Sequence, residues 1–208
     1  MLPIRHTDDE IIEVGIDEAG RGSLWGPMYA AAVIWTDSGT PLTQNIKDSK
    51  KLTQKRRELL ADYIKDYALD WSIGIVSAKE IDELGMTKSN QLAFSRALEN
   101  LQVMPGRILI DGCLSVPTYP WSMIPQIVEP EADNKYISVA AASVLAKTER
   151  DNWVLEYASL NENVSERYDL AKCKGYGTAK HRAGILEHGK HEQHRELFLR
   201  KLLNIQTD

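Results

Sequence analysis

The stretch from residue 12 to residue 22 constrains the fold more than any other part of the chain. Apolar side chains alternate with polar or small ones from Ile12 to Asp17, which is the period of a β-strand with one apolar face. Glu18 follows directly, and then a turn of sequence Gly20-Arg21-Gly22. Carboxylates at the end of a core strand are costly to bury unless a cation neutralises them, and glycines let a backbone approach a ligand closely. The stretch therefore predicts a core strand that ends in a metal and anion site.

The rest of the chain alternates strands with helices, which indicates an α/β fold with a mixed central sheet flanked by helices. The apolar run at residues 28–35 is expected to pair with the first strand as a hairpin. Further strands are expected at residues 71–76, 107–111 and 124–128, the last at a sheet edge because of Pro125. Helices are expected at residues 54–67, 77–85, 89–101, 136–158, 179–188 and 192–203.

Length and composition set the class of protein. The 208 residues are expected to form one domain, 1–208, in which about 161–208 is a C-terminal helical extension. Two cysteines, no recognisable signal peptide and apolar runs too short for a bilayer favour a cytoplasmic protein that does not contact membranes, and a monomer is expected. The net charge of −5 argues mildly against a nucleic-acid partner. However, carboxylates gathered around a metal lower the total without repelling phosphate.

Acidic residues recur where apolar strands end. Asp17 and Asp111 each end such a strand, Asp133 comes just before the long helix, and Glu18 could complete a set of four. Oxygen ligands alone suit Mg²⁺ or Mn²⁺ rather than Zn²⁺. Neighbouring strand residues point to opposite faces, so Asp17 and Glu18 share a site only if the chain leaves strand geometry at Glu18. The competing interpretation is solvated loop acids, which are common in turns, and spacing alone does not separate the two.

Five blocks of the sequence resemble the type 2 ribonucleases H, the bacterial ribonuclease HII group. They keep the family's order and span nearly the whole chain; each block alone is weak, but together they are highly specific. Aspartate at position 133 favours this group over the sister type 3 enzymes, which usually carry glutamate there. The blocks are Gly15 to Gly22 with Leu24 and Gly26-Pro27, Asp48 to Leu52, Ile110-Asp111-Gly112, Asp133 to Asp151, and Gly175 to Thr178 with His181, Gly189, His194-Arg195 and Phe198.

This resemblance implies a ribonuclease H-like fold and a divalent-metal-dependent endonuclease. Its substrates would be RNA–DNA hybrids and DNA duplexes that contain ribonucleotides, as in ribonucleotide excision repair. It would cut on the 5′ side of a ribonucleotide by two-metal-ion hydrolysis and leave 3′-hydroxyl and 5′-phosphate ends. The catalytic, metal-binding carboxylates implied by position, with Mg²⁺ or Mn²⁺, are Asp17, Glu18, Asp111 and Asp133.

The resemblance also assigns substrate contacts. The 2′-hydroxyl, which distinguishes RNA from DNA, would be read by the backbone of Gly20, Arg21 and Gly22 and by the ring of Tyr176. From the residues alone, Tyr176 between two glycines is more readily a packed turn tyrosine than a substrate contact, and lysines on helices are commonly solvated. The phosphate contacts implied by the resemblance are Ser49, Lys50, Ser143 and Lys147.

The chain departs from the family pattern at several positions, notably Ser23, Trp25 and Cys113. None of these changes removes an expected metal ligand. Trp25 and Cys113 are expected close to the site, where they bear on substrate preference more than on the reaction.

Three other interpretations compete. The histidines near the C-terminus could hold zinc, but no cysteine or carboxylate pattern supports this, and His181 and His194 are expected to fix the C-terminal helices by hydrogen bonds. A ribonuclease H-like DNA nuclease or resolvase would use similar carboxylates without selecting the 2′-hydroxyl. A non-catalytic binding module is opposed by the carboxylates, which would repel phosphate without metal.

Overall fold

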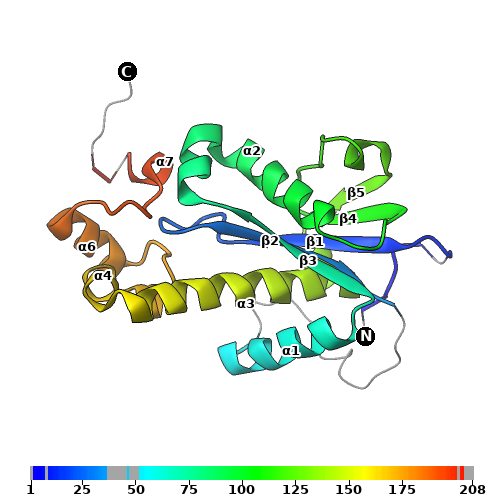
Figure 1. Ribbon diagram of the computed structural model, residues 1–208, viewed down its shortest axis with the longest axis horizontal. Helices are drawn as coiled ribbons and strands as arrows, with labels where there is room; N and C mark the ends of the chain where they lie inside the picture. Colours follow the sequence, from blue (N-terminus) through cyan, green and yellow to red (C-terminus); the bar gives the residue numbers. More distant parts are fainter. Residues whose placement is uncertain (1, 8, 37–45, 47–51, 201, 204–208) are drawn as a thin grey trace.

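The computed structural model describes residues 2–7, 9–36, 46, 52–200 and 202–203, and centres on a mixed five-stranded sheet (Figure 1). The strand order is β3 (Asp70–Val76), β2 (Met28–Ile34), β1 (Glu13–Ala19), β4 (Arg107–Asp111) and β5 (Gln126–Glu129). β1 pairs antiparallel with β2 and parallel with β4. The predicted hairpin and mixed sheet are confirmed, and β5 lies at the edge, as Pro125 indicates.

Helices cover both faces of the sheet. α2 (Ala78–Glu99) lies on one face, and α3 (Ile137–Leu160) lies on the other with α1 (Gln54–Tyr67) outside it (Figure 1). Val14 and Ile16 belong to the core beneath α2, whereas the next residues of β1 face α3. A Cβ on Gly15 would lie 2.3 Å from the Ser138 carbonyl carbon, so the α3 backbone rests directly on β1 at this point. Gly15 and Asp17 share that face because side chains alternate along a strand.

Local capping signals locate the helix ends. Thr53 caps α1 by accepting the Arg56 N–H, and Ser77 and Glu80 form the expected capping box of α2. The prediction of two helices that separate at Gly85 is confirmed, although the second begins directly after Gly85 rather than at residue 89. Gly85 leaves helical geometry, at φ 75° and ψ 165°, but the helix resumes immediately after it. A single glycine can therefore kink the element without an intervening loop.

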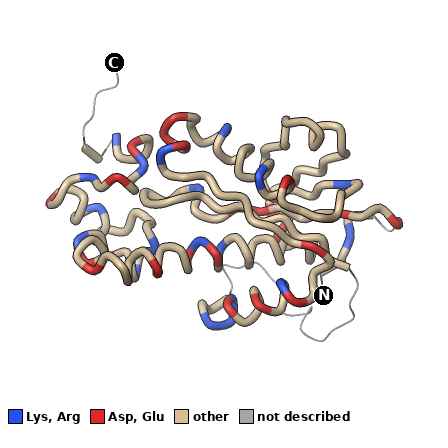
Figure 2. The backbone as a smooth tube through the Cα atoms, viewed as in Figure 1, with Lys and Arg blue, Asp and Glu red and all other residues tan. Residues whose placement is uncertain are grey.

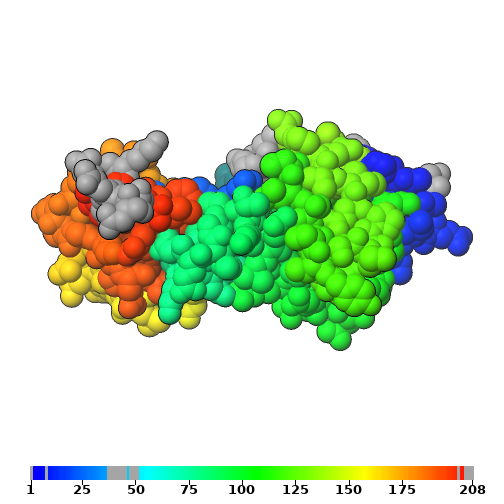
Figure 3. Space-filling view, turned by 90° about the horizontal axis from the view of Figure 1, so that it is seen from above, coloured from blue at the N-terminus to red at the C-terminus, as the bar shows by residue number. Residues whose placement is uncertain are grey.

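The C-terminal part forms a lobe beyond one end of the sheet. It contains α4 (Glu162–Tyr168), α5 (Leu170–Cys173), α6 (Ala179–His188) and α7 (Glu196–Leu199), which pack around the buried Trp25. In Figure 3 this lobe, in orange and red, adjoins the blue-green start of α2, and the upper outline is indented between the lobe and the green body. The packing of this lobe against the end of the sheet sets the position of residues 191–199 relative to the turn at residues 20–22.

The predicted helix over residues 192–203 is wrong for most of its length. Trp25 forms a β-bridge with His194, and the Arg195 N–H donates to the Leu24 carbonyl over 2.9 Å. The backbone of this segment is thus extended against residues 24–26, which removes it from a helix. Helical structure begins only at Glu196, where the Asp82 carboxylate accepts the first free N–H groups. No described helix combines the length and apolar character needed to cross a bilayer.

Candidate active site

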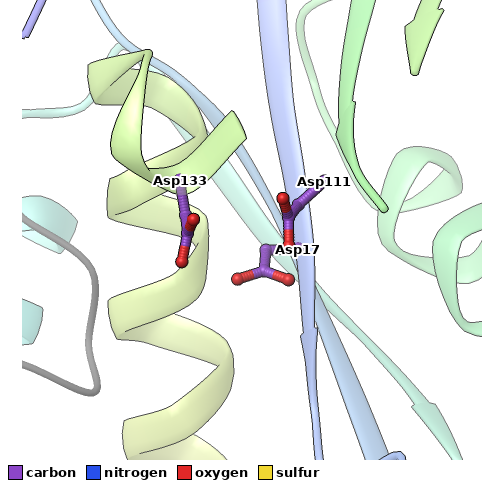
Figure 4. Close-up of side chains that lie close together, drawn as sticks. All are labelled: Asp17, Asp111 and Asp133. Atoms are coloured by element: carbon purple, nitrogen blue, oxygen red, sulfur yellow. The ribbon is translucent and has the colours of Figure 1, made fainter. Parts of the chain in front are cut away.

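Three aspartates from separate elements converge at the end of β1. Asp17 comes from β1, Asp111 from the last position of the parallel neighbour β4, and Asp133 from the short 3₁₀ turn η4 (Ala132–Asn134) before α3. One carboxylate oxygen of each lies within 4.8 Å of the others, and the three side chains face a common space (Figure 4). The parallel pairing of β1 and β4 brings the two strand-end aspartates together, as the sequence predicts.

Glu18 is placed differently from these three. β1 continues in register through Glu18 opposite Ala30 and Ala19 opposite Tyr29, so the departure from strand geometry does not occur at Glu18. The Glu18 side chain is therefore outside the close group, although it lines the same cleft and lies 3.8 Å from Arg21 Nη1. Its role as a fourth ligand stays a prediction.

The electrostatics of the group are those of a site built for cations. Asp17 is buried, and burial, reinforced by the charges of Glu18 and Asp111, holds the pKa of its carboxyl well above the usual range. Hydrogen bonds from Ser143 and from the Glu18 N–H only partly oppose this pKa shift. A divalent ion bound by oxygen ligands would remove the repulsion, so the residues present fit Mg²⁺ or Mn²⁺.

A cleft of about 430 Å³ opens from the aspartates. It joins the acidic group to most of the predicted substrate contacts, while Ser49 and Lys50 lie outside the described residues. Gly22 neighbours the cleft-lining Arg21 and is exposed. Positive and negative residues are interspersed along the chain (Figure 2). The net charge of −5 therefore does not indicate the local charge of the cleft. The predicted residues that line the cleft are Asp17, Glu18, Gly20, Arg21, Asp111, Ser143, Lys147 and Tyr176.

A buried arginine supports the floor of this cleft. Arg150 is fully buried and donates to the Ser23 hydroxyl over 2.6 Å and to the Lys174 carbonyl over 2.9 Å. Its guanidinium carbon also lies 4.9 Å from the centre of the Tyr176 ring. Gly20 adopts φ +87°, and a Cβ there would lie 2.1 Å from Arg150 Nε. Glycine is thus required at position 20 both for its backbone conformation and for space.

An ion-pair chain orients the predicted phosphate-binding lysine. Lys147 Nζ lies 2.8 Å from Asp151 Oδ1 and 4.7 Å from the centre of the Tyr176 ring. Arg57 of α1 pairs with the other oxygen of the same aspartate at 3.3 Å. The lysine is held at the cleft wall by a buried carboxylate, and about one-fifth of its side chain remains exposed.

Several outcomes bear on single residues. The expectation that Trp25 lies close to the site is wrong. Trp25 is buried in the C-terminal core between His191 and Tyr168. Cys113 is exposed. His181 Nε2 and His194 Nε2 lie 3.0 Å apart and share a hydrogen bond, which confirms their structural role.

The structural roles of Arg150, Asp151 and Arg195 are missing from the sequence prediction, since charged residues normally indicate solvent. Only the structure shows that these three are buried.

The sheet, the flanking helices and a cluster of three aspartates, two of them from adjacent strands, define a metal-dependent nuclease of the ribonuclease H-like class. The chain belongs to the ribonuclease HII family: the family model Ribonuclease HII matches residues 14–201. Ribonuclease HII of Bacteroides thetaiotaomicron is 44% identical over 198 residues, which cover 95% of this chain and 94% of the relative. The protein is therefore a ribonuclease H that acts on RNA–DNA hybrids and depends on divalent metal.

Solved structures agree with the fold. The ribonuclease H2 of Pyrococcus horikoshii OT3 superposes with a TM-score of 0.72 at 28% identity and covers 92% of this chain and 97% of its own. A ribonuclease HIII in complex with Mn²⁺, Bst-RNase HIII, superposes with a TM-score of 0.69 over 96% of this chain and 71% of its own. At 21% identity the latter supports the fold alone.

Proposed function

We propose that this ribonuclease H also nicks duplex DNA on the 5′ side of a single ribonucleotide, by two-metal-ion hydrolysis that leaves 3′-hydroxyl and 5′-phosphate ends. The observation that carries the proposal is the shared cleft. Asp17 and Asp111 line the same cleft as Gly20, Arg21 and Tyr176, and Asp133 lies beside these two aspartates. A group that reads one sugar therefore lies beside the groups that hold the metal.

The chemistry of the Gly20-Arg21-Gly22 turn and of Tyr176 accounts for selection of the sugar. Backbone N–H and C=O groups of a glycine-containing turn can hydrogen-bond a 2′-hydroxyl without contacting a base. Tyr176 offers a flat face against a sugar whatever the base, and Lys147 and Arg150 fix the ring from their side. One ribonucleotide would thus suffice for recognition.

The protein's own residues then hold the reacting groups in place. Asp17, Asp111 and Asp133 would hold Mg²⁺ or Mn²⁺, with Glu18 as a further ligand. The bound ions supply an activated water and stabilisation of the departing 3′ oxygen. The Ser143 hydroxyl fixes the Asp17 carboxylate, and the Ala132 N–H fixes Asp111 Oδ1 over 2.7 Å. Lys147 would contact the phosphates beside the scissile bond, and the predicted phosphate contact of Ser143 would require its single O–H to turn from Asp17.

The proposal extends to the surroundings of the enzyme. A monomer in the cytoplasm is the expected form. Ser49 and Lys50 lie outside the described residues and remain expected phosphate contacts.

A set of three labelled duplexes tests the proposal: one with a single ribonucleotide, one entirely of DNA, and one RNA–DNA hybrid, each with Mg²⁺ and with Mn²⁺. We expect the first to be nicked once, with the ribonucleotide carrying a 5′-phosphate on the downstream fragment, and the DNA duplex to stay intact. Equal cleavage of the DNA duplex would instead support a resolvase-like DNA nuclease. Cleavage of the hybrid alone would restrict the enzyme to longer RNA tracts.

A further inference from the structure

Arg195 is a fully buried cation whose hydrogen bonds end on carbonyls of the N-terminal turn. Its Nη1 donates to the Gly20 carbonyl over 2.6 Å and to the Arg21 carbonyl over 3.2 Å. Its Nε donates to the Gly26 carbonyl over 2.8 Å. Burial lowers the pKa of Arg195 to about 9, so the side chain still carries its charge at neutral pH. A charged side chain is thus committed to shaping one loop.

Because the peptide bond is planar, these carbonyl contacts also fix the direction of the neighbouring backbone N–H groups. In a trans peptide the C=O and the N–H point in opposite directions. The carbonyls of Gly20 and Arg21 point at Arg195, so the N–H groups of Arg21 and Gly22 point away from it, toward the exposed side of the turn. Among the described residues, neither N–H has a hydrogen-bond acceptor within the protein. Charge on the carbonyl side also strengthens an N–H on the opposite side.

The proposed sugar-recognition wall of the cleft consists of the Gly20-Arg21-Gly22 turn and Tyr176. His194, the residue before Arg195, positions Tyr176. The His191 N–H donates to His194 Nδ1 over 2.8 Å, so the proton of His194 lies on Nε2. That proton bonds His181 Nε2 at 3.0 Å, and His181 Nδ1–H donates to the Tyr176 carbonyl over 3.0 Å. Burial lowers the pKa of both rings, His194 to about 3, which keeps the pair neutral. The histidine pair thereby anchors the Tyr176 backbone.

The two anchors are themselves fixed by the folded body. Asp82 of α2 accepts the N–H groups of Glu196 and Leu197 at 2.9 Å each, directly after the pair. On the other side, the Trp25 ring meets the His194 ring edge-on, with centroids 4.7 Å apart. Trp25, which departs from the family pattern, is therefore part of the support.

We propose that His194-Arg195 is a positioning pair for selection of the 2′-hydroxyl, a role that rests on the proposed function. Arg195 aims the N–H groups of Arg21 and Gly22 at the sugar, and His194 sets Tyr176 through His181. Neither side chain touches the substrate. Because one dipeptide holds both the Gly20-Arg21-Gly22 turn and Tyr176, its position sets the distance between them.

A pair of substrates and a pair of variants test this role. The substrates are duplexes with one ribonucleotide or with the matching 2′-fluoro nucleotide, which is a much poorer hydrogen-bond acceptor at the same position. In the wild type we expect kcat/KM to favour the ribonucleotide strongly. In Arg195→Met we expect this preference to fall at least tenfold, with Mn²⁺ affinity unchanged by direct titration. Arg200→Met, an exposed change of the same type in the same segment, should keep the preference.

The possible results separate the role from simple damage to the fold. A merely structural loss lowers the rates on both substrates alike, and an unchanged preference in Arg195→Met would overturn the proposal. If that variant does not fold, Arg195→Lys serves, since one ammonium cannot bond the Gly20 and Gly26 carbonyls as the guanidinium does. We expect its preference to fall about threefold or more, and an unchanged preference again refutes the role. A wild type with no preference would refute the proposed function itself.

Discussion

Replacement of Asp17 by asparagine should stabilise the metal-free protein. Asp17 lies within 4.8 Å of two other carboxylates and is buried, so its charged form is unfavourable without a cation. Two unit charges at that distance repel by about 3 kcal/mol at an effective dielectric constant of about 20. Asparagine keeps the shape and an oxygen that can accept the Glu18 N–H, which Asp17 Oδ1 binds at 2.7 Å. We therefore expect Asp17→Asn to raise the free energy of unfolding by about 1–3 kcal/mol in EDTA at pH 7.

Thermal unfolding measures this directly. For a chain of this size the expected gain corresponds to a rise in Tm of roughly 3–9 °C. Asp62→Asn, the same change at an exposed position of α1, serves as the control and should shift stability by less than about 0.5 kcal/mol. Mn²⁺ at about one thousand times the wild-type Kd should reverse the order, because binding then stabilises the wild type by about 4.1 kcal/mol and the variant, which lacks one ligand, by less.

The effect of Asp17→Asn on stability depends on pH. The pKa of Asp17 is raised in the folded state, so the folded protein binds this proton more readily than the unfolded chain does. The penalty is full above the folded pKa, shrinks as the pH falls below it, and is gone only below the unfolded value near 3.8. The stability difference between wild type and Asp17→Asn in EDTA should shrink on acidification from pH 7. A variant less stable than wild type in EDTA at pH 7 would refute this reasoning.

Three further predictions concern packing, capping and phosphate contact. Gly15→Ala should lower both stability and Mn²⁺ affinity, because its Cβ meets the backbone of α3, whereas Gly74→Ala, which meets the backbone of α2, should lower stability alone; unfolding and metal titration check both. Glu80→Gln should cost about 1 kcal/mol at pH 7, discounted for a side chain about one-third exposed. Arg96 and the Ser77 N–H lower the pKa of Glu80 from 4.5 to about 2, so denaturant unfolding should show this cost disappearing as the pH falls across that interval. Lys147→Met should reduce the slope of log binding constant against log salt by about 0.9, measured on a hybrid with Ca²⁺ in place of the active metal; an unchanged slope would exclude a phosphate contact.

Much of the fold follows from local patterns. Alternation in β1 predicts that Gly15 and Asp17 share one face and Val14 and Ile16 the other, and strand ends predict the meeting of Asp17 with Asp111. The Thr53 cap and the Ser77 capping box place two helix starts correctly. These features are set by neighbours in the sequence, so the sequence alone reveals them.

The errors arise where distant segments decide the local structure. Residues 191–195 are not helical because they pair with the backbone near Trp25, a partner far away in sequence. The burial of Arg150 and Arg195 has the same origin: each donates to carbonyls of residues 20–27 that only the fold brings near. Glu18 stays in strand geometry because β2 pairs with it, which the glycines after it do not indicate.

The most direct test of the account is the initial rate of RNA–DNA hybrid cleavage by wild type and by Asp17→Asn, measured with Mn²⁺ at equal protein concentration. If the aspartates hold the ions that activate water, loss of one ligand should cost several kcal/mol of barrier, a fall of about a thousandfold or more. We predict that fall, with the folded state intact by its Tm in EDTA. A rate within about tenfold of the wild type would contradict the claim that this carboxylate cluster performs the chemistry.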